Sequence, residues 1–136
     1  MGEQRRIDPG VVLPIKGYDK IQLIGEYLAE WEKREGSGQE QRARAEQYLL
    51  DTVSCYHPTH IHCGHCKSCV RKWVALEMNG IQQPEGYWHA HPTTWDGWEG
   101  VMRALQHNIV GWRTDSEDYA TRVCLERHGL WREVAA

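Results

Sequence analysis

The chain has 136 residues, which is enough for one small domain with a modest hydrophobic core. Its formal net charge of −3 gives no general attraction to nucleic acid, and it contains no apolar run long enough for a transmembrane helix. The N-terminus lacks the apolar segment of a secretory signal peptide, so we expect a cytoplasmic protein. These properties exclude a secreted protein and an integral membrane protein as first hypotheses.

The first half of the chain predicts an irregular start followed by two helices. Residues 1–15 read as extended or irregular, with a possible short strand at residues 11–13. Apolar residues at helical spacing predict a helix over about residues 18–33, and a more polar helix follows over about residues 39–50. Residues 52–69 form a loop that is rich in cysteine and histidine.

The second half predicts three more helices. The first covers residues 68–79 and ends at Gly80, which favours a left-handed stop. An aromatic-rich loop over residues 81–94 precedes a helix over about residues 95–107. Thr114-x-x-Glu117 is a capping box that opens a last helix, which we expect to end before Gly129. Little in the sequence indicates a sheet.

Four cysteines lie within fifteen residues, as Cys55-x7-Cys63-x2-Cys66-x2-Cys69. Four thiolates complete a tetrahedral zinc site and leave no open position for water, so the spacing predicts structural rather than catalytic zinc. Gly64 allows the tight turn between two of these ligands. We therefore expect a mainly α fold, namely a small four-cysteine zinc-knuckle domain with helices flanking the metal loop.

Histidines offer an alternative ligand set. A site of three cysteines and one histidine is possible because Cys55 is the most distant thiolate and four histidines share the loop, namely His57, His60, His62 and His65. The His89-x-His91 pair also invites a second metal site, but with no carboxylate or third ligand nearby we favour an ordinary aromatic-rich loop. The fifth cysteine, Cys124, lies on a predicted helix and is expected to be an inert buried thiol.

A basic cluster of Lys67, Arg71 and Lys72 follows the last of the four cysteines. It could bind a phosphate or a carboxylate, although a solvated helix face is the default interpretation. The sequence contains no Ser-His-Asp, H-E-x-x-H or GxGxxG pattern that rises above chance.

A family resemblance is carried by the strings Thr52 to Tyr56 and His62 to Cys69, and by Pro84 and Tyr87 beyond the next helix. Together these residues resemble the C-terminal zinc-binding part of 7-cyano-7-deazaguanine synthases. The resemblance covers about residues 11–88. These enzymes belong to the PP-loop ATP pyrophosphatase superfamily and convert 7-carboxy-7-deazaguanine, ammonia and ATP into the nitrile precursor of queuosine. The family's phosphate-binding string, Ser-Gly-Gly-x-Asp-Ser, does not occur in these 136 residues, and Lys72 stands where the family usually has arginine.

The resemblance implies a division of the chain and a function. Residues 1–88 would form the zinc-binding domain, and residues 89–136 a Trp-rich helical tail packed on it. The protein would be a zinc-binding partial subunit of a 7-cyano-7-deazaguanine synthase-like system. It would be inactive alone, would meet ATP only through a separate PP-loop partner chain, and would have a deazaguanine as its possible substrate. Arg71 or Lys72 could anchor the carboxylate of that substrate.

The alternative is a non-enzymatic zinc-binding module that recruits a protein partner. The acidic balance makes nucleic acid an unlikely partner, and the Trp-rich tail favours a protein. A metal-dependent nuclease or hydrolase would need an open metal position, which four thiolates do not leave.

Overall fold

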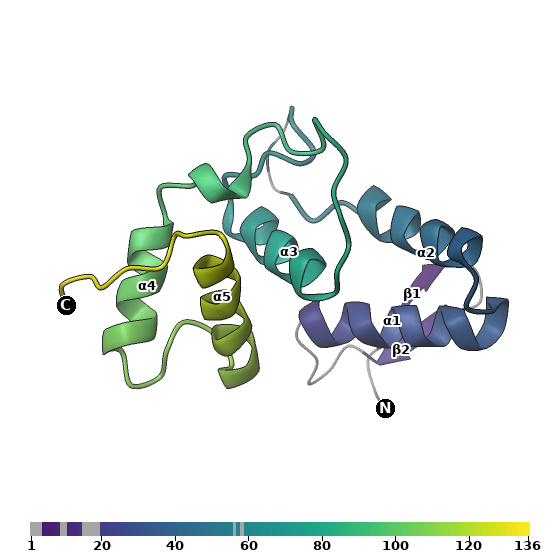
Figure 1. The fold of residues 1–136 in the computed structure, drawn as a ribbon, viewed down its shortest axis with the longest axis horizontal. Coiled ribbons are helices and arrows are strands. Elements are labelled where there is room, and N and C mark those ends of the chain that lie inside the picture. The colour runs from purple at the N-terminus through teal and green to yellow at the C-terminus, as the bar shows by residue number, and fades with distance from the viewer. Residues whose placement is uncertain (1–3, 9–10, 15–19, 56, 58) are drawn as a thin grey trace.

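The computed structural model of this chain describes residues 4–8, 11–14, 20–55, 57 and 59–136. Figure 1 shows the order of the elements from the N-terminus to the C-terminus. Their bounds are β1 Gln4–Asp8, β2 Val11–Pro14, α1 Lys20–Glu35, α2 Gln39–Asp51, α3 Lys67–Met78, the 3-10 turn η1 Pro92–Thr94, α4 Trp98–His107 and α5 Asp115–Arg127. The fold is mainly helical, which confirms the predicted fold class.

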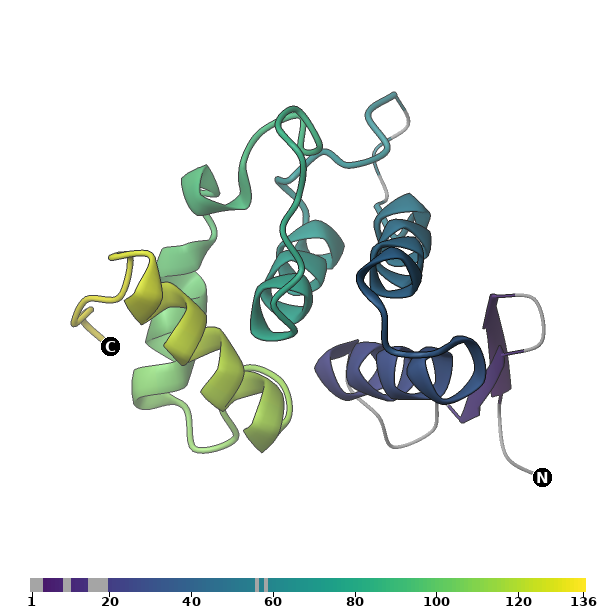
Figure 2. The ribbon, with the colours of Figure 1, turned by 45° about the vertical axis from the view of Figure 1, so that its right-hand side comes forward.

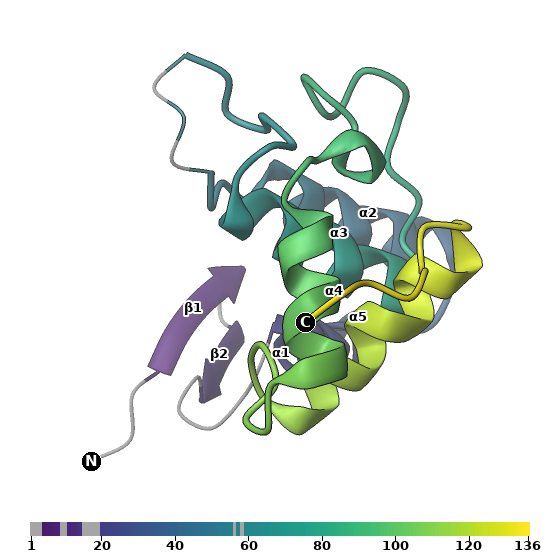
Figure 3. The same cartoon turned by 90° about the vertical axis from the view of Figure 1, so that its left-hand side faces the viewer.

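The described N-terminal residues form a two-stranded antiparallel sheet. The expected strand at residues 11–13 is present as β2, but its partner β1 and the sheet they form were not predicted. The register pairs Gln4 with Pro14 and Arg6 with Val12, and it is interrupted between Arg6 and Asp8. The hairpin lies beside α1, and β2 contacts that helix (Figures 2 and 3).

Helix α3 is the centre of the structure. It contacts α1 on one side and α5 on the other (Figures 1 and 2). Burial extends nearly around the helix, because eight of its twelve residues are buried. Trp73, Val70 and Leu76 are fully enclosed among them. A helix buried on almost every side has neighbours on almost every side. Helix α3 contains Cys69, and its N-cap residue is Cys66.

Each outer helix presents one apolar stripe to this centre. Helix α1 buries Ile24, Leu28 and Trp31, which recur at intervals of three or four residues as the sequence predicted, and it also buries Tyr27. On the other side, α5 buries Cys124 and Leu125. Cys124 is 1% exposed, and burial raises the pKa of its thiol to about 12, as befits an unreactive core residue.

The predicted helix bounds hold to within about two residues, with one exception. The first two residues expected in α1, 18 and 19, lie outside the described residues. The helix expected from residue 95 begins at Trp98 instead. Pro92 opens the turn η1, which the His91 side chain caps by accepting a hydrogen bond from the Thr93 N–H. Trp95 then has an extended backbone that ends the turn before α4 can start.

Loop segments gather at one end of the helices. The described parts of the loop from residue 52 to 66 and the loop from residue 79 to 91 both lie at this end (Figure 3). The second loop is hydrogen-bonded to the first through His62 and Cys63, and α3 connects the two along the chain. None of the helices in the described part of the chain is both long and apolar enough to cross a membrane.

Candidate metal centre

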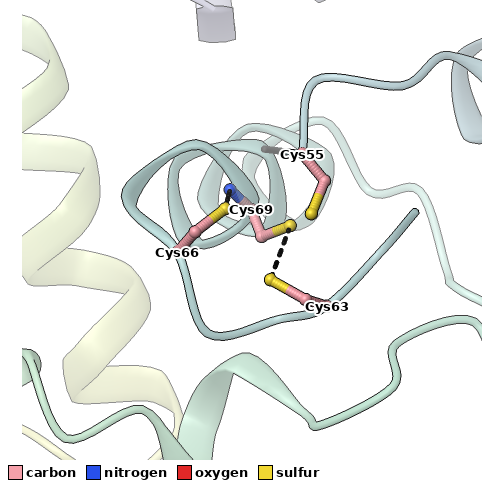
Figure 4. A group of neighbouring side chains, drawn as sticks. All are labelled: Cys55, Cys63, Cys66 and Cys69. Carbon is pink, nitrogen blue, oxygen red and sulfur yellow. Dashed lines mark hydrogen bonds between the residues drawn. The ribbon is translucent and has the colours of Figure 1, made fainter. Parts of the chain in front are cut away.

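The four cysteine side chains converge at the N-terminal end of α3 (Figure 4). Their four sulfurs all lie within 4.8 Å of one another. Cys55 follows α2, and Cys63 comes from the loop that precedes α3. Cys66 is the N-cap residue of α3, where its sulfur accepts the Cys69 N–H at 3.3 Å. Two of the four sulfurs are thus positioned by the same helical turn.

The spacing of the sulfurs fits one tetrahedral ion. Metal–sulfur bonds of about 2.3 Å place the sulfurs of a regular tetrahedron about 3.8 Å apart. The Cys63 and Cys69 sulfurs are 3.8 Å apart. Closing the whole cluster around an ion therefore needs only small side-chain movements, and this group of residues could hold a metal ion.

Backbone amides point at the same sulfurs. The His57 N–H donates to the Cys55 sulfur at 3.3 Å, and the His65 N–H donates to the Cys63 sulfur at 3.4 Å. The Cys69 N–H likewise donates to the Cys66 sulfur. Such bonds favour the thiolate over the thiol, and the N-terminus of α3 adds the positive end of its dipole.

The acid–base properties of the thiols depend on their burial. Burial acts to raise the pKa of Cys55, but hydrogen bonds from the backbone of Cys63 and His57 outweigh it and lower that pKa to about 7. Burial raises the pKa of Cys63, and it raises that of Cys69 strongly. Without a cation, this cluster therefore retains protons on its inner sulfurs, and a bound metal would supply the positive charge that replaces them.

Gly64 joins the cysteine loop to the loop beyond α3. It has a φ of +78°, and a Cβ at this position would lie 1.6 Å from the Ala90 carbonyl oxygen. This close approach lets the Ala90 N–H donate to the Cys63 carbonyl at 2.9 Å, and the His89 N–H donate to the His62 carbonyl at 2.7 Å. The sequence predicted the tight turn at Gly64, but it did not reveal the segment that packs against it.

The histidines of the loop make other contacts. His57 Nδ1 accepts hydrogen bonds from the Thr59 and His60 amides, and the His62 ring stacks on Tyr87. His65 Nε2 lies 3.1 Å from Thr94 Oγ1. Among the described residues, the four cysteines are the one group with three or more suitably close ligand atoms. The geometry thus favours four cysteines over a site in which a histidine replaces Cys55.

The His89-x-His91 pair is divided between two roles. His89 stacks on His60 with ring centres 3.6 Å apart, whereas His91 caps η1. A cavity of about 500 Å³ opens beside these rings, and its lining includes Cys63 and Cys66. One side of the cysteine cluster therefore faces an imidazole-lined opening.

The two basic residues that were singled out as substrate contacts lie on α3 but have different surroundings. Arg71 Nε is 2.8 Å from a carboxylate oxygen of Glu117, which is itself buried on α5. Lys72 is only 5% exposed, and its ammonium group donates to the Thr52 carbonyl. The expectation that this cluster forms a solvated helix face is therefore wrong for Lys72.

A third cation, Lys20, reaches the same region from α1, and sequence reasoning assigned it no role at this centre. Its ammonium group lies 3.3 Å from both the carbonyl and the hydroxyl oxygen of Ser68. Ser68 immediately precedes Cys69. Forty-eight residues separate Lys20 from Ser68, and no sequence pattern signals a contact over that separation.

Comparisons with known proteins place the cysteine cluster inside a recognised segment. Residues 21–80 match the family model described as "Queuosine biosynthesis protein QueC". This match confirms the predicted family resemblance over that segment, and residues 89–136 lie outside it. No solved structure shows significant similarity.

Three curated relatives are 7-cyano-7-deazaguanine synthases. The Methanothermobacter thermautotrophicus protein is 47% identical over 36 residues, which are 26% of this chain and 16% of the relative. The Ruegeria pomeroyi protein is 40% identical over 47 residues, or 35% of this chain and 20% of the relative. The Rhizobium etli protein is 29% identical over 73 residues, or 54% of this chain and 30% of the relative. The chain therefore spans less than a third of each of these relatives.

Proposed function

We propose that this chain is a zinc-binding partial subunit of a 7-cyano-7-deazaguanine synthase-like system. The observation that carries the proposal is that the four-cysteine cluster lies within the segment that matches the QueC family. Zinc is the proposed ion because soft thiolate ligands in a tetrahedral arrangement select it over magnesium or calcium. Four thiolates also fill its coordination sphere, so its role would be structural.

A structural ion would stabilise the cysteine loop, the segment between α2 and α3. The residues that the structure describes between α2 and α3, namely 52–55, 57 and 59–66, form no helix or strand. Cys55 and Cys63 have no regular element to fix them, whereas Cys66 and Cys69 are held by α3. Zinc bound by all four would fix this loop and supply free energy of folding. It would thereby hold the facing residues, including those that line the 500 Å³ cavity, in one arrangement.

ATP chemistry would come from a separate PP-loop chain. The relatives are several times longer than the region they share with this chain. The Ser-Gly-Gly-x-Asp-Ser string is not among the 136 residues of this chain. In this proposal a deazaguanine carboxylate is bound beside the metal loop. Arg71 is the more accessible of the two predicted contacts, and it would have to share its guanidinium between the ligand and Glu117.

A second candidate function is a protein-interaction module without catalytic activity. The exposed apolar side chains of the cysteine loop favour it, because Val53 is 55% and Ile61 is 61% exposed. In this proposal the two side chains would belong to a contiguous apolar patch, which is the kind of surface that contacts another protein. Both functions therefore use a protein partner, and they differ in whether the complex makes a nitrile.

The metal is tested first, on the full chain. Elemental analysis should find one zinc per chain, and Cys63→Ser should lose it. Cys124→Ser is the matched control, because Cys124 lies on α5, is buried in the hydrophobic core and is not one of the four clustered cysteines. Equal zinc content in both variants, or none in the parent chain, would refute the metal assignment.

The catalytic role is tested by reconstitution. A pull-down from the native source with the zinc-loaded chain should recover a PP-loop ATPase chain in stoichiometric amount. The mixture should then convert 7-carboxy-7-deazaguanine, ATP and ammonia to the nitrile only when both chains are present. A stable complex without nitrile formation would support the interaction module, and an absence of complex would reject both candidates.

A further inference from the structure

Two lysines approach the cysteine cluster from different elements. Lys72 belongs to α3 and donates to the carbonyl of Thr52, three residues before Cys55. Lys20 opens α1 and lies 3.3 Å from the carbonyl and hydroxyl oxygens of Ser68. Both ammonium groups are thus held against the chain segments that carry the cysteines, and the oxygens that hold them are neutral.

Burial of the Lys20 and Lys72 ammonium groups has an unfavourable free energy. Lys72 is 5% exposed and Lys20 is partly buried. A buried ammonium group is unfavourable unless a negative charge lies close by. Burial, followed by repulsion from Lys20, lowers the pKa of Lys72 to about 8. Burial, followed by repulsion from Arg71, lowers the pKa of Lys20 to about 8. Lys20 and Lys72 are therefore two cations that a nearby negative charge would stabilise.

The other charges of this region largely cancel. Arg71 is paired with Glu117 at 2.8 Å, and both side chains are mostly removed from solvent. Glu117 also lies 3.6 Å from Arg113, and Asp51 is a second carboxylate that acts on Lys72. Two carboxylates thus offset Arg71 and Arg113, and Lys20 and Lys72 remain as the excess positive charge. A divalent ion with four thiolates has a net charge of −2, whereas one with three thiolates and a neutral histidine has a net charge of −1. The two positive charges of Lys20 and Lys72 equal in size the net charge of −2 on the four-thiolate site.

We propose that Lys20 and Lys72 are the counter-charges of a metal tetrathiolate, and that they hold the ion in its site and reduce the reactivity of its sulfurs. Each lysine acts from its own element, so the ion would also attract α1 toward the N-terminal turn of α3. This inference rests on the metal site proposed above, and it does not depend on any role in deazaguanine chemistry.

A purely structural role for the lysines makes different predictions. The Lys72 ammonium lies 5.6 Å from the centre of the Tyr87 ring, so the side chain could serve only to pack and to bridge Thr52. In that case methionine, which has a similar length and no charge, should leave the affinity for the ion unchanged. Removal of an uncompensated buried charge should even stabilise the fold.

The experiment compares zinc-loaded full-length chains carrying Lys20→Met, Lys72→Met or both substitutions. Lys67→Met is the matched control, because Lys67 is an exposed lysine of the same helix, in the turn before Lys72. Zinc affinity is measured by competition with a chromophoric chelator. Each single variant should bind zinc about 10–100-fold more weakly, as is typical when a residue that supports the ligands is removed, and the double variant more weakly still. The control should stay within about twofold, as for an exposed charge.

A second measurement follows the zinc-bound sulfurs themselves. Alkylation of the zinc-loaded protein by iodoacetamide should be faster in the Lys72→Met and double variants, because the thiolates lose a nearby positive charge. Lys72→Arg should restore both the affinity and the slow alkylation in large part. A change in folding alone would not give this rescue together with a raised reactivity in folded protein.

The outcomes separate the two proposals. A parent chain that binds no zinc would overturn the metal site and this inference together. A parent chain that binds zinc, with affinity and alkylation rate unchanged in the folded methionine variants, would overturn only the inference. Should Lys72→Met fail to fold, Lys20→Met and Lys72→Arg decide the question, because Lys20 is less buried and arginine keeps the charge.

Discussion

Replacing Gly64 by alanine should damage the metal centre without touching a ligand. The backbone of Gly64 has a φ of +78°, which a residue with a side chain adopts only under strain. The added Cβ would also lie 1.6 Å from the Ala90 carbonyl oxygen and 2.8 Å from its carbonyl carbon. These are backbone atoms, so no side-chain rotation can relieve the overlap. The loop around Ala90 must move away from the cysteine loop.

The size of the effect follows from what that movement breaks. The left-handed conformation costs a residue with a side chain about 1–2 kcal/mol. Separating the two loops loses the hydrogen bonds from the His89 and Ala90 amides, each with a net contribution of about 1 kcal/mol. We therefore expect Gly64→Ala to lower the free energy of unfolding by about 3–4 kcal/mol.

Gly86→Ala provides the matched control. Gly86 lies in the same loop as Ala90 and has a φ of +81°, but a Cβ there would meet no atom within 4 Å. Its cost should be the conformational strain alone, about 1–2 kcal/mol. Urea unfolding of the zinc-loaded variants measures both values, and chelator competition should show weaker zinc binding only in Gly64→Ala. Equal destabilisation of the two variants would refute the reasoning, because the overlap with Ala90 would then contribute nothing.

Three further outcomes follow from contacts described above. Glu117→Gln should lower the free energy of unfolding by about 3 kcal/mol. This value is at the low end for a broken buried ion pair, because the Arg71 side chain is still 21% exposed. A loss below about 1 kcal/mol in urea unfolding would contradict it. Tyr87→Phe should cost about 1–2 kcal/mol in the same assay, since the phenol donates to the Leu50 carbonyl, and an unchanged midpoint would mean that this bond has no net value. Treatment with a chelator should speed amide hydrogen exchange at His65 well before it does so in α5. The His65 N–H donates to a cysteine sulfur of the cluster, whereas α5 packs in the core. Simultaneous exchange in both would indicate that the ion stabilises the whole chain uniformly.

The sequence predicted those features whose causes are local. The cysteine spacing predicted that four sulfurs come together, and the helical spacing of Ile24, Leu28 and Trp31 located α1 to within two residues. Gly80 ends α3 with a φ of +70°, as its position after the last apolar residue indicated. In each case the residues that determine the structure lie within a few positions of one another, so their pattern is visible in the chain.

The missed features depend on contacts between distant segments. The Lys20–Ser68 and Arg71–Glu117 contacts span 48 and 46 residues, and neither partner lies in a motif that identifies the other. The sequence predicts a solvated face for Lys72 because a cluster of charged residues on a helix is usually solvated. Its burial became visible only when the packing of α3 on both sides was known. The strand β1 was missed because its residues, Gln4–Asp8, are mostly polar.

The short distance between the cysteine sulfurs also has a consequence for oxidation. The Cys63 and Cys69 sulfurs are 3.8 Å apart, and a disulfide requires about 2.05 Å, so a small movement would allow them to bond. A bound ion occupies the sulfur lone pairs and keeps the sulfurs separate. Loss of the ion in air would therefore be followed by cross-linking within the loop, which would prevent the ion from returning until a reductant opens the bond. The same proximity that makes the cluster a good metal site makes the empty site sensitive to its redox environment.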